Sequence, residues 1–303
     1  MMQSASSSVI LVAGSANLDF VVRAAQIPAP GQTVLGRDFQ TFPGGKGANQ
    51  AVACARAGGA ATAMLAAFGA DDFAKLLKAS LAQAGVVLHE VESSQPTGTA
   101  FICVSDAGDN AITVAPGANQ DLKSAHWPEN LPISHLLMQL ETPVPTVQAF
   151  AQAARAQGAK VVLNAAPARA LPSELLRMID ILIVNEGELA ELAGAQGDVR
   201  AQLQRMAAHG IATVIVTLGA DGCIALHHGQ FLQQSAFKVS VVDTTAAGDT
   251  FCGALVAALS QGATMQDALQ TASAASALTC TQLGAQSSIA HRTEVVAFMA
   301  SSV

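Results

Sequence analysis

The segment Asp243-Thr-Thr-Ala-Ala-Gly-Asp-Thr-Phe251 lies between a valine-rich run, residues 239–242, and an apolar helical pattern over residues 250–259. The first run predicts a β-strand and the second predicts a buried helix. The segment between them is therefore expected to be a strand-to-helix turn made of small residues. Such turns are typical of α/β folds, and their backbone N–H groups can bind an anion at the helix start.

The turn places three small residues, Ala246, Ala247 and Gly248, directly before Asp249. Their N–H groups can face outward together, and the helix dipole adds partial positive charge at the same place. Asp249 falls in the first helical turn, where an aspartate often serves only as a cap. A carboxylate beside an anion site would repel the anion, unless its task is to accept a proton from a nucleophile. Taken alone, the segment leaves both interpretations of Asp249 open.

A second glycine-rich segment, Phe42-Pro-Gly-Gly-Lys-Gly-Ala-Asn49, precedes a helical pattern over residues 49–56. It is not a Walker A loop, because the upstream glycine is missing and no Ser or Thr follows the lysine. Its glycines would let a polar ligand approach the backbone, with Lys46 and Asn49 as donors. The alternative is a flexible turn that carries a solvated lysine.

Apolar runs alternate with helical patterns along the rest of the chain. The expected strands are 9–13, 63–68, 135–140, 161–164, 181–185 and 213–218, and the expected helices are 72–83, 144–157, 173–178, 186–192 and 199–209. Continuous apolar strands separated by helices predict a mostly parallel sheet with both faces covered. Two turn-rich segments, 19–42 and 97–114, interrupt this alternation and are expected to form β insertions.

The composition narrows the function classes. With 51% hydrophobic and 12% charged residues, the 303-residue chain is expected to fold around a large core rather than remain disordered. Aromatic residues make up only 4%, and the net charge is −7 without a basic cluster, so binding to nucleic acid is not expected. No GxGxxG follows the first strand, which argues against a dinucleotide oxidoreductase.

The cysteines and the apolar runs indicate where in the cell the protein is expected to be. The five cysteines are odd in number and widely spaced, which favours reduced thiols in the cytoplasm. The run over residues 9–13 is too short for a signal peptide, and no apolar stretch is long enough to span a bilayer. We therefore expect a cytoplasmic protein without a membrane partner.

Taken together, residues 44–49 and 243–251 resemble the two signatures of the ribokinase-like (PfkB) carbohydrate kinase family, and the resemblance extends over about residues 9–298. It implies an α/β fold with a three-layer α/β/α core, a mostly parallel central sheet and a small β-sheet lid. A single domain would span residues 1–303, and the discontinuous lid would comprise residues 18–43 and 97–116. Relatives often pair their lids, so a homodimer through the lid is also expected.

The resemblance implies ATP-dependent phosphorylation of a small sugar, with the 5-hydroxyl of D-ribose as the expected acceptor. The alternatives are another sugar or a nucleoside, such as deoxyribose or adenosine, and, in a different class, a non-catalytic sugar or nucleotide sensor. Asp249 matches the catalytic base, and Ala246, Ala247 and Gly248 match the anion hole. The positions that match sugar-binding residues are Asn17, Asp19, Gly45, Lys46, Asn49, Glu141 and Asp249.

The resemblance also implies a nucleotide side and two cations. The matching nucleotide positions are Asn185, Thr217, Gly219, Gly222, Ala247, Gly248 and Ser273, the last of which replaces the Asn or His of many relatives. Glu188 matches an acid linked through water to the Mg²⁺ of ATP, and its alternative is a solvated helix acid. An activating K⁺ would lie at positions matching Asp243, Thr245, Thr279, Gln282, Gly284 and Ser288.

Overall fold

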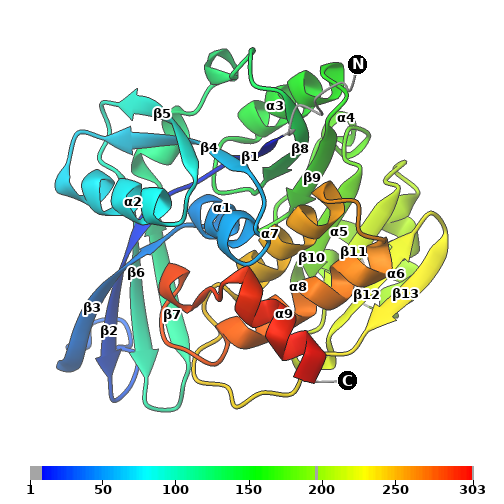
Figure 1. The fold of residues 1–303 in the computed structure, drawn as a ribbon. Helices are drawn as coiled ribbons and strands as arrows, with labels where there is room; N and C mark the ends of the chain where they lie inside the picture. The colour runs from blue at the N-terminus through cyan, green and yellow to red at the C-terminus, as the bar shows by residue number, and fades with distance from the viewer. Residues whose placement is uncertain (1–8, 195–196, 302–303) are drawn as a thin grey trace.

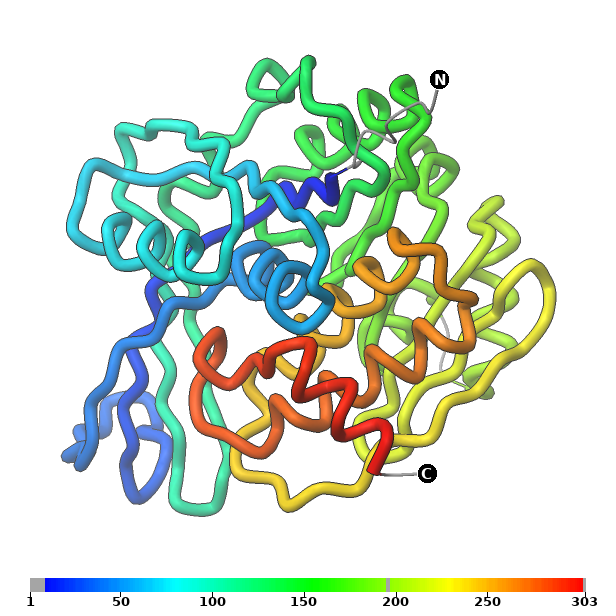
Figure 2. The backbone as a smooth tube through the Cα atoms, in the orientation of Figure 1, coloured from blue at the N-terminus to red at the C-terminus, as the bar shows by residue number. Residues whose placement is uncertain are grey.

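The computed structural model describes residues 9–194 and 197–301, which form one large and one small β-sheet with helices around the large one (Figures 1 and 2). The large sheet has nine strands in the order β13 (Gln230–Gln234), β12 (Cys223–His227), β11 (Thr213–Thr217), β10 (Ile181–Asn185), β9 (Lys160–Asn164), β8 (Ile133–Met138), β1 (Val9–Ala13), β4 (Thr62–Gly69) and β5 (Val87–Ser93). Pairing is parallel from β11 to β5, whereas β12 and β13 are antiparallel additions.

Helices cover both faces of this sheet. One face carries α1 (Lys46–Arg56), α2 (Asp72–Gln83), α7 (Ala247–Ser260), α8 (Met265–Thr279) and α9 (Arg292–Ser301). The other carries α3 (Val144–Ala156), α4 (Ser173–Leu176), α5 (Glu186–Ala193) and α6 (Val199–Ala207). Successive residues of β1 alternate between the two cores, since Ile10 and Val12 join the first and Leu11 and Ala13 the second. The expected three-layer α/β/α architecture is therefore confirmed.

The small sheet has the order β3 (Gly36–Gly44), β2 (Asn17–Ala24), β6 (Gly98–Ser105) and β7 (Asn110–Ala115). It lies to one side of the core, at the lower left in Figure 1. Because β2 and β6 run parallel, both strands start near the core, and Asn17 pairs with Gly44 on one side and with Gly98 on the other. Two of its phenylalanines are exposed, Phe39 at 64% and Phe101 at 54%.

Single helical turns complete the described chain. They are η1 (Gly117–Asp121), η2 (Ser124–His126), η3 (Gly219–Asp221) and η4 (Gln286–Ser288). Among the helices in the described residues, none combines the length and apolar character that crossing a membrane requires.

The strand expected over residues 239–242 is wrong. The chain there is an extended loop with Val241 and Val242 largely exposed, and the N–H of Val242 donates to the carbonyl of Cys280 at 2.8 Å. None of the strands in the described residues pairs with this valine-rich run. The following helix α7 begins at Ala247, three residues earlier than its apolar pattern suggests.

Candidate active site

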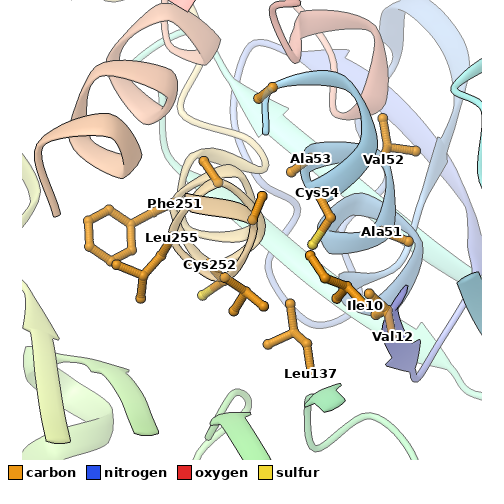
Figure 3. Close-up of a cluster of buried hydrophobic side chains, with 14 of the residues drawn as sticks. Ile10, Val12, Ala51, Val52, Ala53, Cys54, Leu137, Phe251, Cys252 and Leu255 are labelled. Carbon is orange, nitrogen blue, oxygen red and sulfur yellow. The ribbon is translucent and has the colours of Figure 1, made fainter. Parts of the chain in front are cut away.

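The carboxylate of Asp249 lies in the first turn of α7 and is held on both oxygens by α1. Asn49 Nδ2 donates to Oδ2 at 3.0 Å, and Gln50 Nε2 donates to Oδ1 at 2.9 Å. The two helices approach closely because Gly253 has no side chain: a Cβ there would lie 2.6 Å from the carbonyl oxygen of Gln50. Figure 3 shows the small and apolar side chains of α1 and α7 that pack in this region, including Ala53. Asp249 is therefore fixed from behind and 9% exposed.

The turn before Asp249 presents backbone to the same region. Ala246 adopts the left-handed conformation with φ of 61°, and its carbonyl accepts the N–H of Thr250 at 2.8 Å. The N–H of Ala247 donates to the carbonyl of Thr244 at 3.2 Å, which uses one of the three amides expected to bind an anion. The first-turn N–H groups of Gly248 and Asp249 precede the helical ladder and can meet a ligand. Gly248 faces open space, since a Cβ there would meet no atom within 4 Å.

A polar cavity of about 240 Å³ opens at this helix start. Seven of the residues singled out from the sequence line it: Lys46, Asn185, Glu188, Thr217, Ala246, Gly248 and Asp249. It is also lined by Asn164, Ala166, Ile183, Val184, Thr244 and Cys252. The cavity lies beyond the carboxyl ends of β9, β10 and β11, which is where open α/β sheets bind ligands.

Lys46 supplies the positive charge of the cavity. Burial opposes its charge, but the carboxylates of Asp249, Glu141 and Glu188 outweigh that effect, so the pKa of the ammonium lies above its ordinary value. Lys46 therefore stays charged at neutral pH and can meet a second anion at the cavity. Its backbone N–H also donates to Oε2 of Glu141 at 3.1 Å.

Glu188 and Asn185 cap each other at the start of α5. The N–H of Asn185 donates to Glu188 Oε2 at 2.8 Å, and the N–H of Glu188 donates to Asn185 Oδ1 at 2.8 Å. Burial raises the pKa of Glu188, the Asn185 amide and Lys46 lower it, and Asp249 adds to the increase, so the net value lies above the ordinary one. A cation near this carboxylate would relieve that cost. Glu188 is thus both a capping residue and a wall of the cavity.

The residues expected to bind the sugar lie where the small sheet joins the core. Asn17 is 2% exposed, and its Oδ1 accepts from Asn119 Nδ2 at 2.7 Å. Gly45, with φ of 87°, lies so close to the backbone of β2 that a Cβ on it would be 2.6 Å from the N of Asn17. Glu141, three residues beyond β8, accepts from the hydroxyl of Ser15 at 2.5 Å.

The charged form of the Asp19 carboxyl is strongly disfavoured at its position. Burial first, then the charges of Glu141 and Asp249, raise its pKa to about 7. Three carboxyl groups from β2, α7 and the segment after β8 therefore act on one another in a small volume. Such clusters are costly to fold and mark functional sites more often than structural ones.

The expected K⁺ positions are brought together in part. Asp243 Oδ1 accepts from the backbone N–H (2.9 Å) and the hydroxyl (2.7 Å) of Thr245, and Oδ2 accepts from the N–H of Gly284 at 3.0 Å. Burial works to raise the pKa of Asp243, but these hydrogen bonds outweigh it and the pKa lies below the ordinary value. Thr279 is buried and donates to Thr250 Oγ1 at 3.0 Å.

The other cation positions lie on the same loop as Gly284. Gln282 lies on the segment between α8 and η4. Ser288 is the last residue of η4, and its hydroxyl donates a hydrogen bond to the carbonyl of Ala285 at 2.8 Å. Within residues 9–194 and 197–301, no three His, Cys, Asp or Glu side chains gather in a metal-binding group. A cation here would therefore depend on carbonyl and hydroxyl oxygens around Asp243, which suit K⁺ chemically better than a transition metal.

Four of the expected nucleotide residues lie outside the cavity lining: Ala247, Gly219, Gly222 and Ser273. Gly219 and Gly222 flank η3 with φ of 55° and 93°. A Cβ on Gly222 would lie 2.6 Å from the N of Ala236, so this glycine permits a close chain crossing. Ser273 is buried on α8, with its Oγ 4.0 Å from Cys223 Sγ.

Sequence reasoning missed several polar residues of the site. Gln50 and Asn164 share a hydrogen bond of 3.0 Å behind Asp249, and Ser15 and Asn119 orient expected sugar residues. One signal was available for Gln50, which follows Asn49 directly in an otherwise alanine-rich helix. For the others the partner is more than 100 positions away, so only the fold shows the contact.

Comparison with known proteins agrees with this geometry. Residues 8–292 match the profile described as pfkB family carbohydrate kinase. The chain is 40% identical over 300 residues to a ribokinase of Haemophilus influenzae, covering 96% of this chain and 98% of that protein. The crystal structure of a Thermotoga maritima ribokinase superposes with a TM-score of 0.90 at 36% identity, covering 97% of this chain and 99% of that one. The Arabidopsis thaliana ribokinase complexed with ribose and ATP gives a TM-score of 0.85 at 32% identity, covering 96% and 98%.

Proposed function

The chain belongs to the pfkB family of carbohydrate kinases, and we propose that it transfers the γ-phosphoryl group of ATP to the 5-hydroxyl of D-ribose. The observation that carries this proposal is the placement of Asp249. A carboxylate at the start of α7 lies beside free helix N–H groups and Lys46, in a cavity rich in polar groups. These are the parts that phosphoryl transfer to an alcohol needs: a proton acceptor and preorganised positive charge.

Asp249 orients the sugar hydroxyl and accepts its proton as the reaction proceeds. The hydroxyl oxygen forms a bond to the γ-phosphorus while the bond from that phosphorus to the bridging oxygen of ADP breaks. The N–H groups of Ala246 and Gly248, together with Lys46, stabilise the charge that spreads over the phosphoryl oxygens, whereas the N–H of Ala247 is already bonded to the carbonyl of Thr244. Asn49 and Gln50 hold the carboxylate so that its free lone pairs face the cavity.

The sugar binds between the core and the small sheet. Asn17, Asp19, Gly45, Lys46, Asn49 and Glu141 supply the donors and acceptors for its hydroxyls. A site built to hydrogen-bond hydroxyls rejects analogues that lack them, because buried polar groups would then be left unpaired. The small sheet, whose strands lie within residues 17–44 and 98–115, one residue beyond each end of the expected 18–43, acts as a lid that excludes water and so limits hydrolysis of ATP.

The nucleotide lies along the carboxyl ends of β10 and β11. Asn185, Thr217, Gly219 and Gly222 line its phosphate and ribose side, and Ser273 lies toward its base. The Mg²⁺ that accompanies ATP neutralises phosphate charge when bound, and Glu188 would hold it through water, since its half-buried carboxylate lines the same cavity. An activating K⁺ would bind around Asp243, Thr245, Thr279, Gln282, Gly284 and Ser288, behind the turn.

The proposal also includes a homodimer and a cytoplasmic location. Exposed phenylalanines on the small sheet support a homodimer formed through the lid. All five cysteines are unpaired, which suits the reducing cytoplasm where ATP is available.

An ADP-release assay over pentoses, hexoses and nucleosides, each with and without K⁺, tests the proposal. We expect D-ribose to give the highest kcat/KM, with deoxyribose and adenosine well below it, and K⁺ to increase turnover. If ribose releases no ADP while another acceptor does, the substrate assignment is wrong and the kinase class remains. If no acceptor releases ADP, a non-catalytic sensor takes its place.

A further inference from the structure

A chain of buried amides lies behind the carboxylate of Asp249. Gln139, directly after β8, donates from Nε2 to Oε1 of Gln50 at 2.6 Å. Gln50 Nε2 in turn donates to Asp249 Oδ1 at 2.9 Å and to Asn164 Oδ1 at 3.0 Å. Both glutamines are almost completely buried, with exposures of 0% for Gln50 and 1% for Gln139. Burying amide groups costs free energy of folding unless they are hydrogen-bonded. The donor-to-acceptor direction along the chain therefore shows which way each amide is oriented.

Only one orientation of the Gln50 amide satisfies all three neighbours. In the reverse orientation its oxygen would face the oxygens of Asp249 and Asn164, and its NH₂ group would face that of Gln139. Both N–H groups of Gln50 are therefore committed to acceptors, and its oxygen to a donor. The negative charge of Asp249 polarises this chain and strengthens each bond in it.

Neither Gln50 nor its neighbour Asn49 lines the cavity. Among the described residues, those that line the cavity include Asn164 and Asp249 but not Gln50. The close packing at Gly253 holds the Gln50 backbone against α7, so its side chain cannot move away. Gln50 can thus influence a substrate only through Asp249 and Asn164.

We propose that Gln50, anchored by Gln139, is a positioning residue that holds Asp249 in the orientation in which it accepts the proton of the sugar hydroxyl. The inference rests on the proposed phosphoryl transfer. With Gln50 in place, Oδ1 is occupied and the carboxylate cannot rotate about its bond to the Cβ. Without that hydrogen bond the carboxylate samples orientations that do not point at the hydroxyl, so turnover falls while sugar and ATP still bind.

The substitution Gln50→Glu provides a sharp test because it preserves shape and the bond from Gln139. At high pH the new carboxylate faces Asp249 across the former hydrogen bond, and the two charges repel. At low pH the pair shares one proton, and the introduced carboxyl group donates to Asp249 much as the amide does. We expect kcat relative to the unmodified enzyme to be about 10–100-fold lower at pH 8.5 and to recover at least fivefold by pH 6. The KM values for sugar and ATP should stay within about threefold.

The ratio to the unmodified enzyme at each pH is needed because other titrating groups act on Asp249. They are Asp19 on β2, Lys46 on α1, Glu188 on α5 and Cys252 on α7. These groups are the same in both proteins, so their effect divides out of the ratio. A ratio that stays constant between pH 6 and 8.5 would overturn the proposal, since it would show that the side chain at position 50 does not act on Asp249.

Two further variants serve as a control for lost stability and as a replacement test. Thr213→Val removes a different buried hydrogen bond, to His227, and should lower the Tm without changing kcat. If Gln50→Glu does not fold, Gln139→Met decides in its place: lower kcat at unchanged KM supports the anchored chain, and unchanged kcat contradicts it. All ratios are measured on the acceptor that the unmodified enzyme phosphorylates best, so a failure of the ribose assignment is seen separately, in the unmodified enzyme.

Discussion

Gly44 on β3 packs directly against the carboxylate of Asp19 on β2. A Cβ at Gly44 would lie 2.6 Å from Asp19 Cγ and 2.8 Å from its Oδ1, which real contacts do not allow. We therefore expect Gly44→Ala to displace Asp19 and to raise the KM for ribose about tenfold or more, with the KM for ATP unchanged. Initial rates over a ribose titration measure the effect. An unchanged KM for ribose would show that Asp19 does not bind the sugar.

Asp19 should make the stability of the free enzyme depend on pH. Its pKa is about 7 in the folded protein, above the value of 3.8 in the unfolded chain, so the folded state binds the proton more tightly. The free energy of unfolding contributed by this group therefore falls as the pH rises from about 4 to about 7. Replacing the carboxyl by an amide in Asp19→Asn should raise the Tm by about 2 °C or more at pH 8 and lose that gain near pH 4. Equal differences in Tm at both pH values would contradict the prediction.

Asp249→Asn should lower kcat by about 10²–10⁴-fold, because the amide cannot accept the proton. Ribose binding, measured by calorimetry, should remain within about threefold. Asp267→Asn is the matched control, since Asp267 is also a first-turn acid, on α8, and its carboxylate accepts from the hydroxyl of the capping residue Thr264 at 2.7 Å. The control should keep its turnover, which separates proton transfer from capping. A turnover close to that of the unmodified enzyme in Asp249→Asn would exclude the catalytic assignment.

Gly248→Ala should separate stability from activity. A Cβ at this position meets no atom of the protein, and Gly248 lies within α7, where alanine is favoured over glycine by about 0.5–1 kcal/mol. We expect a slightly higher Tm. The methyl group would occupy the space proposed for the phosphoryl oxygens, so kcat should fall at least tenfold. A variant with unchanged kcat would place the phosphoryl group elsewhere.

The proposed dimer depends on the aromatic face of the small sheet. Phe20 stacks with Phe101 at a centroid distance of 5.3 Å and with Phe39 at 6.1 Å. Light scattering should give twice the chain mass of 30.7 kDa for the unmodified protein. The double variant Phe39→Ser, Phe101→Ser should give the monomer mass, because it removes apolar area that a partner would cover. Val296→Ser, an exposed apolar change on α9, should remain dimeric.

The alternation of apolar runs and helical patterns predicted most of the large sheet. The helix over Asp72–Gln83 and the strand over Ile181–Asn185 begin and end as expected. The antiparallel strands β12 and β13 were not expected, since their half-buried patterns give a weak signal. The strand expected over residues 239–242 is absent although valine favours strands, because a strand also needs a paired neighbour and none of the described strands pairs with this run.

The site was predictable where it rests on local sequence. Lys46 and Asp249 lie at a glycine-rich turn and in a first helical turn, which local spacing indicates, whereas Asn185 and Glu188 were expected only from the resemblance to the family. Gln50 gave only the weak signal of following Asn49 in an alanine-rich helix, because a glutamine in a helix is usually exposed. Its role depends on the approach of α1 and α7, which nothing local encodes.

The join between the small sheet and the core has an evolutionary consequence. Asn17, Asp19 and Gly44 belong to strands of the small sheet, whereas the turn before α7 and the ends of β10 and β11 belong to the core. In the proposed site, selection for a new acceptor molecule can therefore act on the small-sheet part of the sugar site while Lys46, Asn49 and Glu141 of the core and the residues that bind the phosphate donor stay unchanged. Members of this fold can therefore change the molecule that they phosphorylate while they keep the same phosphoryl-transfer chemistry.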